Sequence, residues 1–127
     1  MQKYAIFRLK ATSVVPKLTY PFFKKRIAME TEYKLVDNTD LHQYEFPVGD
    51  QPPRIEYMIS KSGLIYLNHT EVPPEMEGKG VASALVLAAL QDIDRRGMKL
   101  VPMCPYVASY IRRHPEWKRL IADGFGV

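Results

Sequence analysis

The middle of the chain alternates between apolar and polar positions, which is the spacing of β-strands with one buried face. Two sets of side chains occupy every second position, one within residues 54–60 and one within residues 64–72: Ile55, Tyr57 and Ile59, then Ile65, Leu67 and His69. Because side chains alternate across a strand, each set is expected on one face. Lys61-Ser62-Gly63 separates the two segments and predicts a hairpin turn. The two strands are therefore expected to pair antiparallel.

Shorter apolar runs on the N-terminal side extend this pattern. Residues 33–36 and 41–48 predict two more strands, the second with Pro47 near its end. A cluster of glycine, aspartate, glutamine and proline at residues 49–53 predicts a turn between strands. The sequence thus predicts an antiparallel meander of about four to five strands.

After residue 80 the apolar spacing changes to that of a helix. Apolar residues recur at three- and four-residue intervals over residues 81–96: Leu85, Ala88, Ala89 and Ile93. Gly97 is expected to end this helix. A short apolar strand follows at residues 99–103, and Pro105 then opens a second helix at residues 106–113. Strands followed by a long helix, a further strand and a C-terminal helix predict an α+β fold.

Charge is distributed unevenly along the 127 residues, a length typical of one domain. Seven of the 18 Lys and Arg residues, and none of the 14 Asp and Glu residues, lie in residues 1–28. We expect residues 1–28 to be a basic arm outside the fold and residues 29–127 to be the domain. A targeting segment is one alternative for the arm, and an alternation at residues 2–9 also fits a short strand. The remainder is slightly acidic, which makes a nucleic-acid partner unlikely.

Composition also limits metal and membrane chemistry. A single cysteine excludes an internal disulfide and a cysteine-rich zinc site. The three histidines show no metal-ligand spacing: His42, His69 and His114. No apolar run reaches the roughly 18 residues of a membrane span. We therefore expect a cytoplasmic protein without a metal centre or a membrane partner.

The loop before the long helix has an unusual composition. Two prolines follow the strand end at Glu71-Val72, then come Gly78 and Gly80, and no Ser, Thr, Asp or Asn stands directly before the helix. A helix N-terminus without a side-chain cap leaves backbone N–H groups and a partial positive charge for water or for an anion such as a phosphate. A tight turn that requires positive φ is the structural alternative for the glycines.

Three segments of the sequence resemble one family. They are the loop Val72-Pro-Pro-Glu-Met-Glu-Gly-Lys-Gly-Val-Ala82 with the preceding His69-Thr-Glu, then Val101-Pro-Met-Cys104-Pro, then Tyr110-Ile-Arg-Arg-His-Pro-Glu116. The loop resembles the acyl-CoA pyrophosphate loop of the GNAT superfamily of acetyltransferases, whose pattern is Gln/Arg-x-x-Gly-x-Gly/Ala. Gly80 and Ala82 match that pattern, and Glu77 departs from it at the first position. The whole combination, over roughly residues 36–122, is similar to very small, single-domain GNAT-like proteins.

This resemblance implies a GNAT-like fold that binds acetyl-CoA as its cosubstrate. The residues expected to hold the cosubstrate surround the helix start: Val72, Glu77, Gly78, Lys79, Gly80, Val81, Ala82 and Ser83. In such folds the strand that ends at Val72 and the strand at residues 99–103 part from each other, and the pantetheine arm enters the gap. Tyr110 resembles the tyrosine that protonates the leaving CoA thiolate in many members.

Two further residues are candidates for the chemistry. Cys104 follows the strand that borders the expected gap, where its thiolate could accept an acetyl group, although a lone cysteine is usually a small buried residue. His69 suits a general base, whereas its alternation with Ile65 and Leu67 fits a core histidine equally well. Glu71 shares the spacing of His69 and is the spare base.

The predicted function is an N-acetyltransferase that transfers acetyl from acetyl-CoA to a small amine or an exposed protein amine. The alternative is a non-catalytic acyl-CoA-binding or sensing module, because the loop would serve both. The sequence does not identify the acceptor.

Overall fold

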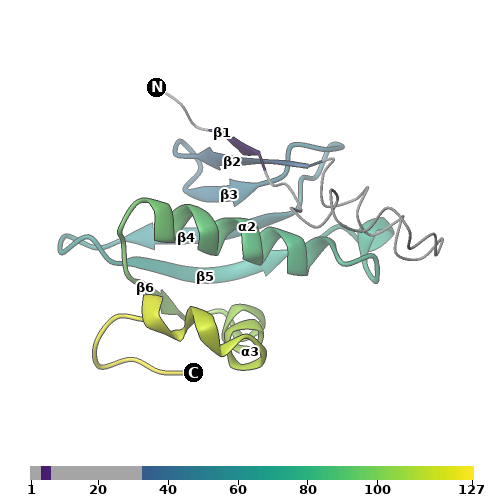
Figure 1. Cartoon of the computed structure of the whole chain (residues 1–127). Helices are drawn as coiled ribbons and strands as arrows, with labels where there is room; N and C mark the ends of the chain where they lie inside the picture. The colour runs from purple at the N-terminus through teal and green to yellow at the C-terminus, as the bar shows by residue number, and fades with distance from the viewer. Residues whose placement is uncertain (1–3, 7–32) are drawn as a thin grey trace.

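The computed structural model describes residues 4–6 and 33–127, and these form one mixed sheet covered by helices (Figure 1). Its strands follow one another in sequence order: β1 (Tyr4–Ile6), β2 (Lys34–Asn38), β3 (Gln43–Glu45), β4 (Arg54–Ile59), β5 (Ile65–Glu71) and β6 (Leu100–Pro102). Neighbours from β1 to β5 are antiparallel, so the predicted meander is confirmed. β6 is parallel to β5, because the chain crosses over through a helix between them.

The helices follow the predicted order, which confirms the α+β class. They are η2 (Pro74–Met76), α2 (Val81–Arg95), α3 (Pro105–Arg113) and η3 (Pro115–Leu120). In Figure 1, α2 lies across one face of the sheet, and α3 and η3 lie beside β6. Gly97 follows α2 with φ 70°, the left-handed conformation expected of a residue that ends a helix.

The core lies between α2 and the covered face of the sheet. The helix contributes small and branched side chains that are almost fully buried: Ala84, Leu85, Val86, Ala88, Ala89, Leu90 and Ile93. Strands β4 and β5 contribute Ile55, Tyr57, Ile65 and Leu67 to the same cluster. The alanines allow the helix to approach the strands closely, and each fully buried Leu or Ile stabilises the fold by about 1.5–3 kcal/mol.

A buried polar network joins the C-terminal end of α2 to three strands. The Tyr44 hydroxyl donates to Asp92 Oδ2 at 2.8 Å, and the Tyr57 hydroxyl donates to Asp37 Oδ1 at 2.5 Å. Arg96 donates from Nε to Asp92 at 2.9 Å and also pairs with Asp37. Burial, and then the neighbouring Asp92 carboxylate, raise the pKa of Tyr44, while burial and the Asp37 hydrogen bond raise the pKa of Tyr57. Because each carboxylate has donors, the network is satisfied and fixes α2 on the sheet.

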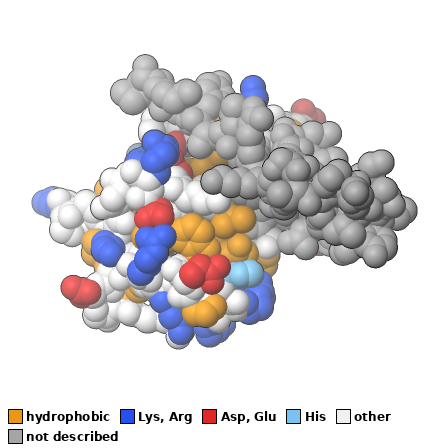
Figure 2. All heavy atoms as spheres, viewed as in Figure 1, with side chains coloured by type: hydrophobic (Ala, Val, Ile, Leu, Met, Phe, Trp, Pro, Cys, Tyr) orange, Lys and Arg blue, Asp and Glu red, His pale blue; other side chains and the backbone are white. Residues whose placement is uncertain are grey.

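Basic side chains form one edge of the molecule. Figure 2 shows Lys and Arg gathered at the lower edge of this view, where α3 and η3 lie. Arg119 in η3 donates two hydrogen bonds of 2.8 Å to the carboxylate of Asp94 in α2. The hydrogen bonds from Arg119 lower the pKa of Asp94. Both side chains are exposed, so this pair contributes little to stability.

Two strand predictions need correction at their ends. Residues 41–48 were expected to be one strand, but β3 covers Gln43–Glu45 alone. Leu41 lies in the preceding turn and is 64% exposed, and His42 has φ 55°, which breaks the extended backbone. Ile59 was expected on the buried face but is 46% exposed, because the β4–β5 hairpin extends beyond the end of α2 (Figure 1).

Part of the basic arm pairs with the sheet. Tyr4, Ala5 and Ile6 of β1 lie opposite Val36, Leu35 and Lys34 of β2. Residues 7–32, which include the expected domain start at Met29, lie outside the described part of the chain. The boundary at Met29 therefore stays a prediction. Within the described residues, no helix has the length and apolar character that a membrane crossing requires.

Candidate functional site

The loop between β5 and α2 depends on two glycines in the left-handed region. Gly78 has φ 78°, and Gly80, the residue directly before α2, has φ 80° and ψ 9°. A Cβ added at Gly78 would have no heavy atom within 4 Å, so the backbone conformation, not crowding, favours glycine there. The positive φ that the structural alternative for these glycines required is present at both positions.

The N-terminus of α2 leaves its first amides without partners from the helix. The amide of Ala84 donates to the carbonyl of Gly80 at 3.0 Å and is the first helical donor, so the amides of Val81, Ala82 and Ser83 precede it and have no acceptor within the helix. No side chain in the described part of the chain caps this helix, and its first turn has no acidic residue. Amides without helical acceptors and the helix dipole together favour an anion at this position.

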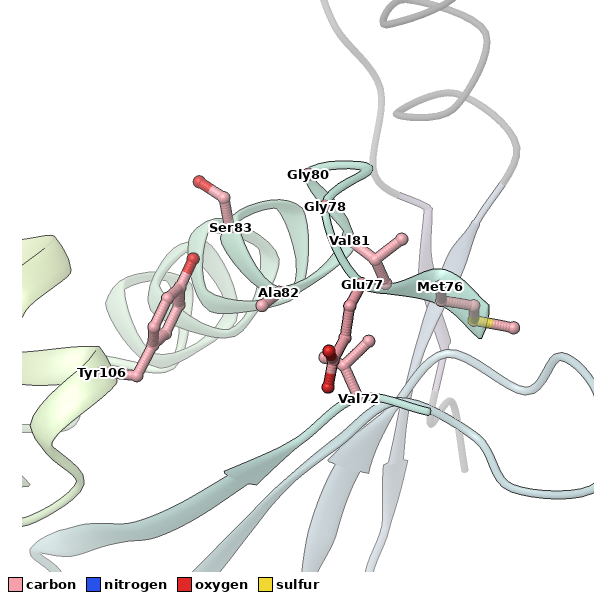
Figure 3. Close-up of a pocket in the computed structure, with 9 residues that line it drawn as sticks. All are labelled: Val72, Met76, Glu77, Gly78, Gly80, Val81, Ala82, Ser83 and Tyr106. Carbon is pink, nitrogen blue, oxygen red and sulfur yellow. The ribbon is translucent and has the colours of Figure 1, made fainter. Parts of the chain in front are cut away.

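A cleft of about 250 Å³ opens beside this helix start (Figure 3). Seven of the residues predicted to hold the cosubstrate line it: Val72, Glu77, Gly78, Gly80, Val81, Ala82 and Ser83. Lys79, which was predicted with them, is exposed and is not among the lining residues. Met76 and Tyr106 line the cleft and were missed. Tyr106 follows Pro105 in the first turn of α3, and its position beside α2 depends on the parallel β5–β6 pairing.

The strands β5 and β6 part next to the cleft. Their pairing ends at Leu67 and Pro102, beyond which β5 continues to Glu71 while the chain after β6 turns into α3. Cys104 lies at this opening, where its amide donates to the carbonyl of Leu67 at 2.8 Å. Its side chain is 4% exposed, and its sulfur lies 3.3 Å from the hydroxyl oxygen of Thr70. The parting strands agree with the arrangement that the family resemblance implied.

A β-bulge changes which side chains of β5 face the core. Tyr57 lies opposite Leu67, but the adjacent Glu56 lies opposite His69, so Asn68 is an extra residue in β5. The alternation therefore shifts after Leu67, and Thr70 takes the face that His69 was expected to occupy. The prediction that His69 shares a face with Ile65 and Leu67 is wrong for this reason.

His69 and Glu71 lie on the outer face of the sheet. His69 Nε2 is 2.9 Å from Glu71 Oε1, and the two side chains are about half exposed. Opposite them on β4, Arg54 Nε donates to Glu56 Oε2 at 2.9 Å. The contact joins the candidate base and the spare base in one pair, in which the carboxylate can orient the imidazole ring.

The predicted acid, Tyr110, lies inside the α3 packing. Its side chain is 4% exposed and its ring stacks on His114, with a centroid distance of 4.2 Å and an interplanar angle of 29°. It does not line the cleft. The structure therefore gathers the loop residues around the cleft, Cys104 and Thr70 at the strand opening, and His69 with Glu71 on the outer face. The catalytic roles of Cys104, His69 and Tyr110 stay predictions.

Within the part of the chain that the structure describes, no group of three or more His, Cys, Asp and Glu side chains is placed to hold a metal ion.

The fold and the loop together define the class of protein. Residues 43–120 match the family model described as GCN5-related N-acetyl-transferase. This match covers more than half of the chain, which therefore belongs to the GCN5-related N-acetyltransferase family. The resemblance carried by the loop and by the segments around Cys104 and Tyr110 is thus confirmed at the level of the family.

The chain is similar to Protein NATD1 of several vertebrates. It is 35% identical over 52 residues to the proteins of Gallus gallus and Homo sapiens. These 52 residues are 41% of this chain, 47% of the Gallus gallus protein and 46% of the Homo sapiens protein. It is 33% identical over 60 residues to the protein of Xenopus tropicalis, which is 47% of this chain and 53% of that protein. The chain spans about half the length of the curated relatives it matches.

Proposed function

We propose that this protein binds acetyl-CoA and transfers the acetyl group to an amine. One observation carries the proposal: the uncapped N-terminus of α2, preceded by two left-handed glycines, faces a cleft next to parting strands. Membership of the acetyltransferase family supports an acyl-CoA rather than another anionic ligand. The cytoplasm is the compartment in which we expect the reaction.

The residues that line the cleft provide hydrogen-bonding groups for the phosphates of the cosubstrate and apolar side chains for its pantetheine arm. The amides of Val81, Ala82 and Ser83 would bind the pyrophosphate, since these three residues line the cleft at the uncapped helix start. Val72 and Tyr106, on opposite sides of the cleft, would contact the pantetheine arm (Figure 3). The thioester would then lie in the opening between β5 and β6.

Direct transfer requires a neutral amine held against the thioester. The amine nitrogen forms a bond to the acetyl carbon, and the carbon–sulfur bond breaks to release CoA. His69 would accept the proton lost by the amine, with its ring oriented by Glu71 at 2.9 Å. Tyr110 is the proposed proton donor to the CoA sulfur.

A two-step variant uses Cys104 as the first acceptor. Its sulfur would attack the acetyl carbon, lose its proton, and release CoA, after which the amine would displace the cysteine. Thr70, at 3.3 Å from that sulfur, could orient it. In this variant, acetyl-CoA without any amine leaves one acetyl group, about 42 Da, on the peptide that contains Cys104.

The deciding experiment measures thiol release from acetyl-CoA over a panel of amines. We expect amine-dependent release by the native protein and a loss of at least about tenfold in the His69→Ala variant. Cys104→Ala should abolish release in the two-step variant and preserve most of it in direct transfer. Glu75→Gln is the control, because Glu75 lies in η2 and outside the cleft lining.

Binding of CoA without release for any amine would contradict the transferase proposal. That result would favour the second candidate, a non-catalytic acyl-CoA-binding module. The burial of Cys104 and Tyr110 is the observation that favours this second candidate, since neither side chain lines the cleft.

A further inference from the structure

The cleft at the start of α2 contains an acidic side chain where an anion is expected. Among the nine described residues that line it, Glu77 alone carries a charged side chain. No Lys or Arg lines the cleft within the described part of the chain, and Lys79 is exposed outside it. Among the described lining residues, the attraction for a phosphate thus comes from backbone amides and the hydroxyls of Ser83 and Tyr106, and the one charged side chain of the lining opposes it.

The Glu77 side chain belongs to the lining of this cleft. Glu77 ends η2 with φ −69° and ψ 148°, and its amide donates to the carbonyl of Pro74 at 3.2 Å. Figure 3 shows its carboxylate pointing from the loop toward Val72, at the end of β5. None of the described residues forms an ion pair with Glu77, so within residues 4–6 and 33–127 no cation neutralises the carboxylate.

We propose that Glu77 is an electrostatic restraint on this site, which lowers its affinity for the phosphates of CoA. The inference rests on the proposed acyl-CoA site and adds a specificity-determining residue to it. A carboxylate and a pyrophosphate within several ångströms repel each other, and water and salt between them screen the repulsion. Substrate and product carry the same phosphates, so the restraint weakens both and favours release of CoA after transfer.

The test compares Glu77→Gln with the native full-length chain by calorimetric titration. We expect Glu77→Gln to bind CoA about fivefold more tightly at low ionic strength, and the ratio of the two dissociation constants to approach one at high salt. Glu75→Gln removes the same charge two residues away, outside the cleft lining, and should change the dissociation constant less than twofold.

Pantetheine separates electrostatic repulsion from a direct hydrogen bond, because it lacks the phosphates of CoA. We expect its affinity to be equal in the native protein and in Glu77→Gln. Weaker binding of both ligands to Glu77→Gln would mean that the carboxylate accepts a ligand hydrogen bond, which overturns the proposal. Equal CoA affinity in Glu77→Gln and Glu75→Gln at low salt would overturn it as well.

The native protein tells the two proposals apart. If the native protein binds CoA and Glu77→Gln binds CoA no more tightly, the electrostatic restraint is refuted while the acyl-CoA site stands. If it shows no CoA binding, both are refuted together. Because Glu77 is exposed, its replacement by glutamine should leave the melting temperature of the ligand-free protein unchanged. That measurement checks that the variant is folded.

Discussion

At the scale of single residues, the backbone conformation at Gly80 links sequence to function most directly. Only glycine adopts φ 80° without strain, and that conformation turns the chain so that α2 begins, beside the cleft, with amides that have no acceptor within the helix. The residue type could be predicted from the sequence, because a strand, two prolines and Gly-x-Gly before a helix is a recognisable pattern. The role of Tyr106 could not, since it depends on tertiary contact between α3 and α2.

Gly80→Val tests the loop. Native protein with CoA at a hundredfold excess over its dissociation constant should gain about 2.7 kcal/mol in free energy of unfolding. We expect Gly80→Val to lose this gain, because a β-branched residue cannot hold the left-handed conformation and its side chain would occupy the approach of the phosphate. Thermal melting with and without CoA measures the effect.

The matched control is Gly63→Val in the hairpin turn between β4 and β5. Gly63 has φ 90° and open space around it, so valine causes a similar backbone strain far from the cleft. Both variants should be less stable than the native protein, but Gly63→Val should keep the full response to CoA. A full response in Gly80→Val would mean that the loop does not hold the ligand.

At the scale of elements, the bulge in β5 decides which side chains face the strand opening. Regular alternation places His69 with Leu67, whereas the extra residue at Asn68 brings Thr70 to that face and turns His69 outward. Nothing in the local residues distinguishes Asn68 from a regular strand position. The existence of β4, β5 and α2 could therefore be predicted from periodicity, but the register within β5 could not.

The attachment of α2 to the sheet predicts a response to alkaline pH. Burial raises the pKa of Tyr44 above its ordinary value of 10, so the native state keeps this proton while the unfolded chain loses it. The contribution to stability is therefore complete below pH 10 and declines above it, by about 1.4 kcal/mol per pH unit for this group. Tyr44→Phe should lower stability near pH 7 by about 1 kcal/mol and flatten the alkaline decline.

Urea unfolding of the native and Tyr44→Phe proteins at roughly pH 8 to 11 measures how steeply the free energy of unfolding declines with pH in each. Tyr57→Phe is the companion variant, because the pKa of Tyr57 is also raised by burial and by its bond to Asp37. The double variant should show the flattest profile. An unchanged decline in Tyr44→Phe would contradict a raised pKa of Tyr44 in the native state.

At the scale of the whole molecule, the cleft and the N-terminal strand β1 lie at opposite edges of the sheet. The parting strands β5 and β6, with Cys104 and the cleft, lie at one edge, and β1 and β2 lie at the other, with β3 and β4 between them. The order of elements followed from their periodicity, whereas the pairing of residues 4–6 with β2 is a long-range contact that local spacing does not reveal. Changes at the β1 edge should therefore have little effect on the site.

A chain that starts at Met29 tests this separation and the predicted domain boundary together. It lacks β1, whose three residue pairs with β2 lie at the edge of the sheet. We expect the shortened chain to fold, to bind CoA within about twofold of the full-length affinity, and to melt within about 4 °C of it, which corresponds to less than 1 kcal/mol. Thermal melting and CoA titration of both chains measure this. A loss of several degrees more would make residues 1–28 part of the domain, and a loss of CoA affinity would connect that segment to the cleft.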